Sequence, residues 1–104
     1  MESGWIGVDF DGTLAEYHGW NNGLIGKPIP LMMERVRNWV RQGIAVKIFT
    51  ARACIPEQVE PIKAWLVENG LPPLEVTNQK DFAMIELWDD RCRQVIVNTG
   101  VLVE

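Results

Sequence analysis

Trp5-Ile6-Gly7-Val8-Asp9-Phe10-Asp11-Gly12-Thr13 is the stretch that decides the fold of this 104-residue chain. Its first four residues form a short apolar run, which is typical of a strand buried on both faces of a parallel sheet. Two acids follow that run directly, and a glycine after them begins a loop. We therefore expect a strand over residues 5–8 that places Asp9 and Asp11 just beyond its carboxyl end.

Patterns of helix and strand alternate along the rest of the chain. Apolar residues at helical spacing indicate one helix over 31–42, opened by Pro30, and another from about residue 57 to Gly70. Short apolar runs indicate further strands at 44–49, 74–77, 84–88 and 94–97. This alternation predicts an α/β fold with a mostly parallel sheet of about five strands, wound right-handed, and ligands beyond the strands' carboxyl ends.

The segment from 12 to 30 is rich in Gly, Asn and Pro, which indicates a loop with a small hairpin. Long loops in small proteins tend to be functional. Near His18, the aromatic residues Tyr17 and Trp20 have two interpretations: they stack on a base or sugar, or they form a satellite core that holds the loop.

Composition limits the class of protein. A chain of 104 residues with 47% hydrophobic content suits one domain, spanning 1–104. The amino-terminal residues do not resemble a secretory signal and no stretch is apolar enough to span a membrane, so we expect a soluble, cytoplasmic protein without a membrane partner. The net charge of −4 argues against nucleic-acid binding over the whole surface but permits a local phosphate pocket.

Polar residues follow the predicted strands at one sheet edge. They are Asp9 and Asp11 after the first strand, Thr50 and Arg52 after the second, and Asp89 and Asp90 after the fourth. Two carboxylates about 4 Å apart repel by roughly 4 kcal/mol at an effective dielectric near 20, so we expect a bound cation. Oxygen ligands without clustered His or Cys favour Mg²⁺, which leaves coordination positions for a substrate phosphate.

These residues also carry a family resemblance. Val8-Asp9-Phe10-Asp11-Gly12-Thr13-Leu14 resembles the first signature of haloacid dehalogenase-like (HAD) phosphatases. Phe49-Thr50-Ala51-Arg52, Lys80 and Trp88-Asp89-Asp90 resemble the second, third and fourth motifs, in the family's order. A Gly-x-Pro-Ile-Pro loop and the Thr-Ala-Arg sequence are similar to those of small HAD-like proteins of phages and bacteria. The resemblance implies a Rossmannoid, three-layer fold.

The resemblance also implies roles for single residues. Asp9 would attack the substrate phosphorus, while Asp11 would protonate the leaving oxygen and then activate water. Thr50 would hydrogen-bond a phosphoryl oxygen, and Lys80 would offset the charge of the phosphate. Mg²⁺ would be held by Asp9, the backbone carbonyl of Asp11, and either Asp89 or Asp90.

Substrate contacts follow from the same resemblance. Gly12 and Thr13 of the signature would lie against the substrate. Arg52 has two interpretations, since it could grip a second substrate phosphate or pair with a neighbouring acid. The chain has no room for the cap domain that selects substrates in larger relatives. Specificity would then come from the 12–30 loop, as a flap over the substrate, or from a homo-oligomeric partner.

We therefore expect a Mg²⁺-dependent phosphomonoester hydrolase that acts on a nucleotide, a nucleic-acid end or another phosphorylated metabolite. Two other functions stay open: a phosphate-sensing regulatory domain in which an aspartate is phosphorylated but turns over slowly, and a binding module on the same fold. Single residues also have simpler readings. The Asp-x-Asp pair and Thr50 could cap turns, and Lys80 could be a solvated surface lysine.

Overall fold

The computed structural model describes residues 4–104. Four strands form one sheet: β1 (Trp5–Val8), β2 (Ala45–Phe49), β3 (Val76–Thr77) and β4 (Met84–Trp88). Two α-helices, α1 (Pro30–Arg41) and α2 (Val59–Glu68), connect β1 to β2 and β2 to β3, and two short 3₁₀ helices, η1 (Ala51–Cys54) and η2 (Pro56–Gln58), precede α2. The expected α/β class is confirmed.

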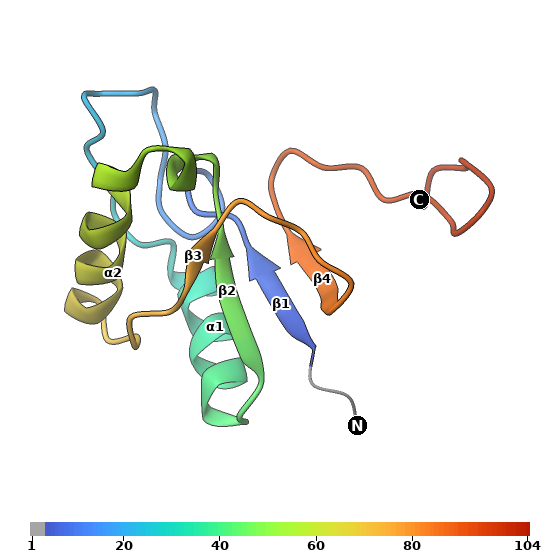
Figure 1. The fold of residues 1–104 in the computed structure, drawn as a ribbon, viewed down its shortest axis with the longest axis horizontal. Coiled ribbons are helices and arrows are strands. Elements are labelled where there is room, and N and C mark those ends of the chain that lie inside the picture. The colour runs from blue at the N-terminus through green and yellow to red at the C-terminus, as the bar shows by residue number, and fades with distance from the viewer. Residues whose placement is uncertain (1–3) are drawn as a thin grey trace.

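The sheet is parallel throughout, with the strand order β3-β2-β1-β4 (Figure 1). Its first strand is therefore central: Val8 aligns with Ile48 of β2 on one side and with Trp88 of β4 on the other. All four strands end at the same edge of the sheet. The residues that follow β1, β2 and β4 are thus close together although they are far apart in sequence.

Both helices follow the sequence pattern closely. Pro30 occupies the first turn of α1, where its missing N–H costs no hydrogen bond, and Gly43 follows the end of α1 at φ +78°. Pro61 lies in the first turn of α2, as its position in the pattern predicts. The helices are 12 and 10 residues long, and none of the described helices is long and apolar enough to cross a membrane.

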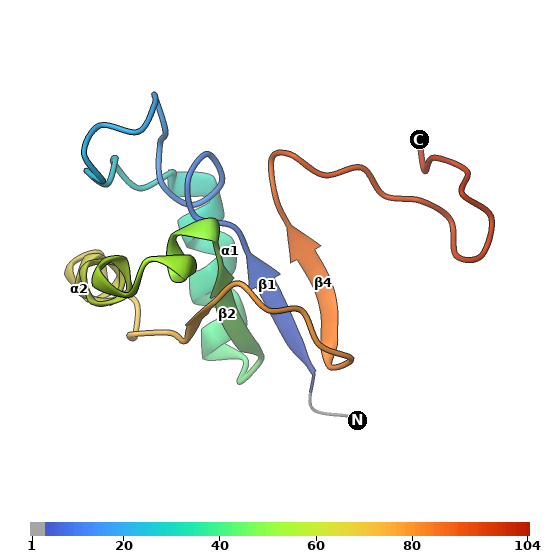
Figure 2. The ribbon, with the colours of Figure 1, turned by 45° about the horizontal axis from the view of Figure 1, so that its top comes forward.

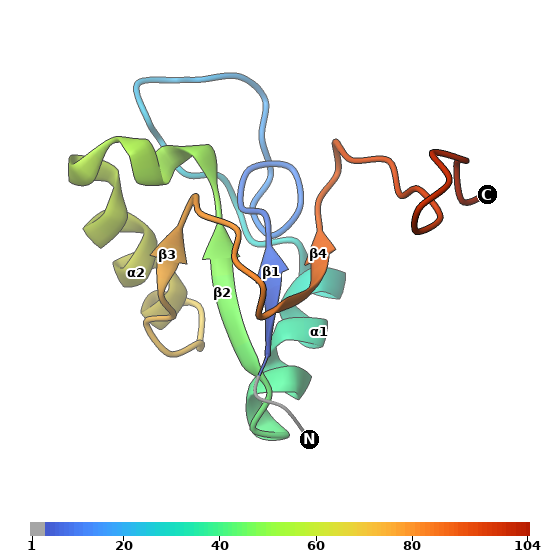
Figure 3. The same cartoon turned by 45° about the vertical axis from the view of Figure 1, so that its right-hand side comes forward.

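The helices cover one face of the sheet, so the expected three layers are wrong. Side chains from both helices, including Val36 of α1 and Leu66 of α2, share one core with Ile6, Val8 and Ile48. Figures 2 and 3 show both helices on the same side of the sheet. Within residues 4–104, no helix covers the opposite face, because only residues 78–83 connect β3 to β4, which is too short a segment to include one.

That connection covers the centre of the opposite face instead. The indole of Trp5 is 3% exposed and donates from Nε1 to Asp81 Oδ1 at 2.9 Å. The ammonium of Lys47 lies 4.5 Å from the centre of the Trp5 ring, and the ring of Phe49 lies 6.4 Å away. A layer of side chains and one loop thus replace the third layer.

The expected fifth strand at 94–97 is also wrong. The Ile96 amide donates to the Val101 carbonyl and the Val103 amide to the Gln94 carbonyl, both at 2.8 Å, so the segment folds back on itself. Asn98 and Gly100 adopt the positive φ angles of this turn, which supplies backbone partners without the sheet. Residues 91–104 extend away from the rest of the chain (Figure 1) and expose several aliphatic side chains.

Candidate active site

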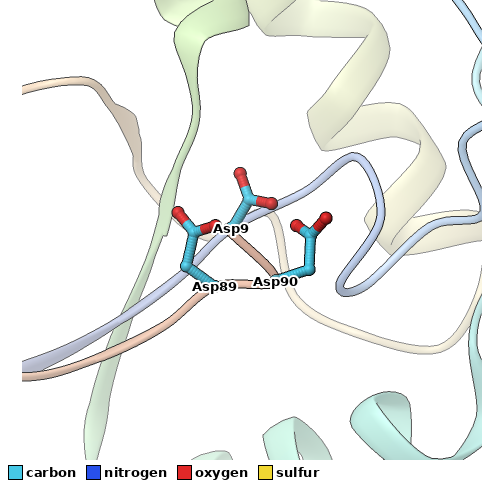
Figure 4. A group of neighbouring side chains, drawn as sticks. All are labelled: Asp9, Asp89 and Asp90. Atoms are coloured by element: carbon cyan, nitrogen blue, oxygen red, sulfur yellow. The ribbon is translucent and has the colours of Figure 1, made fainter. Parts of the chain in front are cut away.

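Strand pairing brings three acids together at the carboxyl edge of the sheet. The Asp9 amide donates to the Trp88 carbonyl at 2.8 Å, which extends the β1–β4 pairing by one residue and places Asp9 beside Asp89. Oxygen atoms of Asp9, Asp89 and Asp90 lie within 4.8 Å of one another, and their side chains point toward the same space (Figure 4). The expected gathering of these acids is confirmed.

The signature sequence forms a tight turn beneath these acids. Three consecutive amides, from Thr13 to Ala15, donate to the Phe10 carbonyl at 2.9–3.2 Å. Gly12 has φ +90°, a region that favours glycine, and a Cβ added there would lie 2.8 Å from Asp90 Oδ2. Gly12 is therefore required both for the turn and for the position of Asp90, and not only as a surface for substrate.

The hydroxyl of Thr13 joins two of the acids. It lies 3.2 Å from Asp9 Oδ2 and 3.1 Å from Asp90 Oδ1, and it accepts the Asp90 amide at 3.0 Å. A hydroxyl has one proton, so it donates to only one carboxylate at a time. The predicted substrate residue Thr13 thus orients the acids in this structure.

Asp9 is the most perturbed of the acids. Burial, hydrogen bonding with Asp90 and the negative charge of Asp89 raise the pKa of Asp9 from 3.8 to about 7, against smaller opposing effects of the Phe10 amide and the Thr13 hydroxyl. Two neighbouring carboxylates without a counter-charge favour retention of a proton on one of them. A cation bound between the carboxylates would remove this reason for the raised pKa of Asp9.

The three acids fit Mg²⁺. They offer only oxygen donors, and Asp90 is exposed while Asp9 and Asp89 are half-buried, which leaves space for the waters that Mg²⁺ retains. Asp89 Oδ1 also accepts the Arg91 amide at 2.8 Å, which fixes its side chain. Both Asp89 and Asp90 are close enough to Asp9 to share a cation with it.

The Asp11 carboxylate lies apart from this group, in a two-point ion pair. Arg52 donates from Nε to Asp11 Oδ2 at 2.7 Å and from Nη2 to Asp11 Oδ1 at 2.9 Å. Such a bidentate pair has the geometry in which a guanidinium binds a carboxylate most strongly. The alternative that Arg52 pairs with a neighbouring acid is therefore what the structure shows.

Arg52 also holds the 12–30 loop. It donates to the carbonyls of Gly23 and Leu24 at 2.8 and 3.3 Å and to Gln58 Oε1 at 2.9 Å. With the two bonds to Asp11, these bonds engage all five guanidinium N–H groups. The side chain is 3% exposed. In this conformation, Arg52 has no donor for a second substrate phosphate, and it connects Asp11 to the loop instead.

Thr50 directly follows β2 and precedes η1. Its amide continues the β2–β3 pairing by donating to the Thr77 carbonyl at 2.9 Å. Its hydroxyl oxygen accepts the Arg52 amide at 3.1 Å, which leaves the hydroxyl proton to donate to another group. Thr50 is 4% exposed and lies on the wall of the same cavity as Asp9.

Lys80 is the predicted site residue that the structure does not bring to the others. It is exposed, on the connection between β3 and β4, and does not line the cavity. Arg91 does line the cavity, and sequence reasoning missed it. The signal was present, since a basic residue directly follows the Asp89-Asp90 pair and a strand end directs such residues toward the same edge.

The acids lie at the wall of an open cavity of about 760 Å³. Its lining combines the polar residues at the strand ends with apolar side chains from the 12–30 loop and the segment after β2. Tyr17 and Trp20 are among them, 45% and 52% exposed, so these aromatic residues do not form the alternative satellite core.

Known proteins give little further information about this chain. No family model matches it, and no curated protein matches it. One solved structure, of a conserved protein from Bacteroides thetaiotaomicron, has a TM-score of 0.69 and 22% sequence identity over 88% of this chain and 78% of that one. This similarity supports the α/β fold.

Proposed function

We propose that this protein is a Mg²⁺-dependent phosphomonoester hydrolase that acts through an aspartyl-phosphate intermediate, on a HAD-like fold. The observation that carries the proposal is the group of Asp9, Asp89 and Asp90, whose oxygens lie within 4.8 Å of one another at the end of the central strand. A bound cation would offset the repulsion between these neighbouring carboxylates. A nucleophilic carboxylate beside a metal suits attack on a phosphoryl group.

The reaction has two steps. One oxygen of the Asp9 carboxylate attacks phosphorus, and the bond from phosphorus to the leaving oxygen breaks as Asp11 protonates that oxygen. Water then attacks phosphorus, gives a proton to Asp11 and releases phosphate with the Asp9 carboxylate restored. Mg²⁺, when bound, would offset the negative charge of the phosphoryl oxygens.

Other side chains would stabilise the charge that develops on the phosphoryl group. The hydroxyl proton of Thr50 is available to a phosphoryl oxygen, and Arg91 lines the same cavity. Preorganised donors of this kind lower the barrier because they need little rearrangement in the transition state. Arg91 would thus take the electrostatic role that the family resemblance implies for Lys80.

The Arg52 pair sets a condition on this mechanism. Both oxygens of Asp11 accept hydrogen bonds from Arg52, so at least one oxygen must be freed and take up the proton that Asp11 then gives to the leaving group. The same observation favours a second candidate function, a phosphate-sensing domain. Held in this way, Asp11 would support slow dephosphorylation, and the phosphorylated state would persist.

Phosphate release distinguishes these functions. The protein is incubated with a generic aryl phosphate, with Mg²⁺ or with chelator, and released phosphate is compared with the protein concentration. An enzyme releases many equivalents of phosphate with Mg²⁺ and none with chelator, whereas a sensor domain releases about one equivalent of the aryl alcohol and keeps the phosphoryl group on Asp9. Asp9→Asn should release none, and the exposed control Glu60→Gln, on α2, should behave as wild type. Equal release by wild type and Asp9→Asn would exclude Asp9 as the nucleophile.

A further inference from the structure

The cavity is larger than the proposed reaction requires. A volume of about 760 Å³ lies in the range of cavities that enclose a whole small molecule, not only its phosphate. Beyond the acids, the cavity is lined by Tyr17, Trp20 and Ile55, which come from the 12–30 loop and the segment after β2. These side chains are 45%, 52% and 37% exposed, so they offer apolar surface to a ligand.

The Trp20 ring of this wall is held in place. The guanidinium carbon of Arg52 lies 4.9 Å from the centre of the Trp20 ring, a cation–π contact that covers one face of the indole. The same guanidinium binds the neighbouring loop carbonyls of Gly23 and Leu24. A ring that is fixed before the ligand arrives loses little conformational freedom on binding, which favours stacking.

Arg52 also fixes the spacing between the reacting acids and the ring. Its guanidinium binds the Asp11 carboxylate and also contacts the Trp20 ring. The Trp20 ring is thus linked to the reacting acid Asp11 through a single guanidinium group. A ligand that places a flat ring there needs a spacer between its phosphate and that ring, as a ribose provides in a nucleotide. An aryl phosphate, with its ring directly on the phosphate oxygen, lacks this spacer.

We infer that Tyr17 and Trp20 form a base-stacking wall and that the substrate class is the nucleoside monophosphate. This inference rests on the proposed phosphomonoesterase function. The phosphate lies at Asp9, the sugar crosses beside Asp11 and Arg52, and the base stacks against the aromatic wall. Stacking accepts every base because each has a π face. Asn78, which also lines the cavity, offers amide groups to the edge of the base.

The first test compares substrates that differ only in the base. The kcat/KM for adenosine and uridine 5′-monophosphates should exceed that for ribose 5-phosphate by roughly tenfold or more, as stacking energies imply. Tyr17→Ala and Trp20→Ala should lower the nucleotide values toward the ribose 5-phosphate value. Phe82→Ala, a fully exposed aromatic control outside the cavity, should leave the kcat/KM values for the nucleotides and for ribose 5-phosphate unchanged. Equal kcat/KM for nucleotides and ribose 5-phosphate in the wild type would overturn the inference.

A second measurement separates this inference from the proposed function. Binding of adenosine 5′-monophosphate to Asp9→Asn, by calorimetry with Mg²⁺, does not need hydrolysis. Tyr17→Ala in that background should weaken binding by about tenfold, and an unchanged affinity would contradict the wall even if phosphate is released. A short oligonucleotide with a terminal phosphate is the parallel substrate. The effect of the base on its kcat/KM, compared with the same effect for the mononucleotide, shows whether the wall binds the base of a free nucleotide or of a strand end. If the base has no effect on kcat/KM for either substrate, the inference is overturned.

Discussion

Arg52 and Asp11 form a two-point ion pair that joins the second strand's carboxyl end to the signature loop, with N–O distances of 2.7 and 2.9 Å. The same guanidinium binds the loop carbonyls and contacts the Trp20 ring. One buried side chain therefore controls three features of the site: the orientation of Asp11, the position of the loop and the aromatic wall.

Arg52→Lys should impair both stability and turnover. A lysine ammonium is a point charge that cannot reproduce the bidentate pair or reach all of the loop acceptors. We expect the free energy of unfolding to fall by about 1–3 kcal/mol, the usual cost for hydrogen bonds that involve charged groups. Turnover should fall by at least tenfold, since Asp11 loses its fixed position. Urea denaturation and steady-state kinetics measure the two effects, and unchanged values for both would show that the pair has no role.

The loss of kcat caused by Asp11→Asn should depend on the leaving group of the substrate. Protonation matters most when the leaving oxygen is strongly basic, so a nucleotide or sugar phosphate should lose about 10²- to 10⁴-fold in kcat, and an activated aryl phosphate much less. The ratio of the two losses is the informative quantity. Equal losses would count against Asp11 as the general acid and leave it a role in structure only.

Stability should depend on pH through Asp9. Its pKa is about 7 in the folded chain, above the ordinary value of 3.8, so the folded state holds this proton more tightly than the unfolded state does. Its contribution to stability is full below about pH 3.8 and is lost as pH rises through about 7. Without metal, the melting temperature should therefore fall from pH 5 to pH 8.

Two controls belong to that measurement. Asp9→Asn removes the titrating group and should flatten the fall in melting temperature. Millimolar Mg²⁺ should raise the melting temperature most at pH 8, because the cation binds the ionised carboxylates of the folded form. If the melting temperature of Asp9→Asn still fell from pH 5 to pH 8, the pH dependence would belong to another group. If Mg²⁺ did not change the melting temperature of the wild type, the metal site would be contradicted.

Gly12→Ala should specifically displace the Asp90 carboxylate from the group of acids. The added Cβ would lie 2.8 Å from Asp90 Oδ2, and φ is +90°, so both the carboxylate and the backbone must move. Gly43→Ala is the matched control, since Gly43 also has a positive φ, +78°, but an added Cβ there meets nothing within 4 Å. Both variants should lose about 1–2 kcal/mol from left-handed backbone strain. Only Gly12→Ala should also lose Mg²⁺ stabilisation and phosphate release; similar behaviour of the two variants would exclude a role for Gly12 in placing Asp90.

The sequence predicts the central part of this fold well because the relevant signals are local. The apolar run before Asp9 indicates a buried strand, and parallel strands place their following residues at one edge, so the meeting of Asp9 with Asp89 and Asp90 can be predicted. The error at 94–97 has a local cause too. Asn98 and Gly100 favour a turn that pairs the segment with residues 101–103 instead of the sheet.

Features that depend on tertiary placement could not be predicted in the same way. The absence of a third layer follows from the short 78–83 connection, whose path across the sheet depends on the strand order. The two-point Arg52–Asp11 pair depends on how the loop packs against η1, which no spacing in the sequence fixes. The exposure of Tyr17 and Trp20 depends on the same packing, and it argues against the satellite core.

The most direct test of the central claim is to trap the phosphorylated protein. Wild type is mixed with a radiolabelled phosphate monoester and Mg²⁺, quenched in acid within one turnover and digested. The account predicts label on the peptide that contains Asp9, released by hydroxylamine as expected for an acyl phosphate, and no label in Asp9→Asn or with chelator. Label on another residue, or phosphate release that proceeds at the wild-type rate in Asp9→Asn, would contradict it.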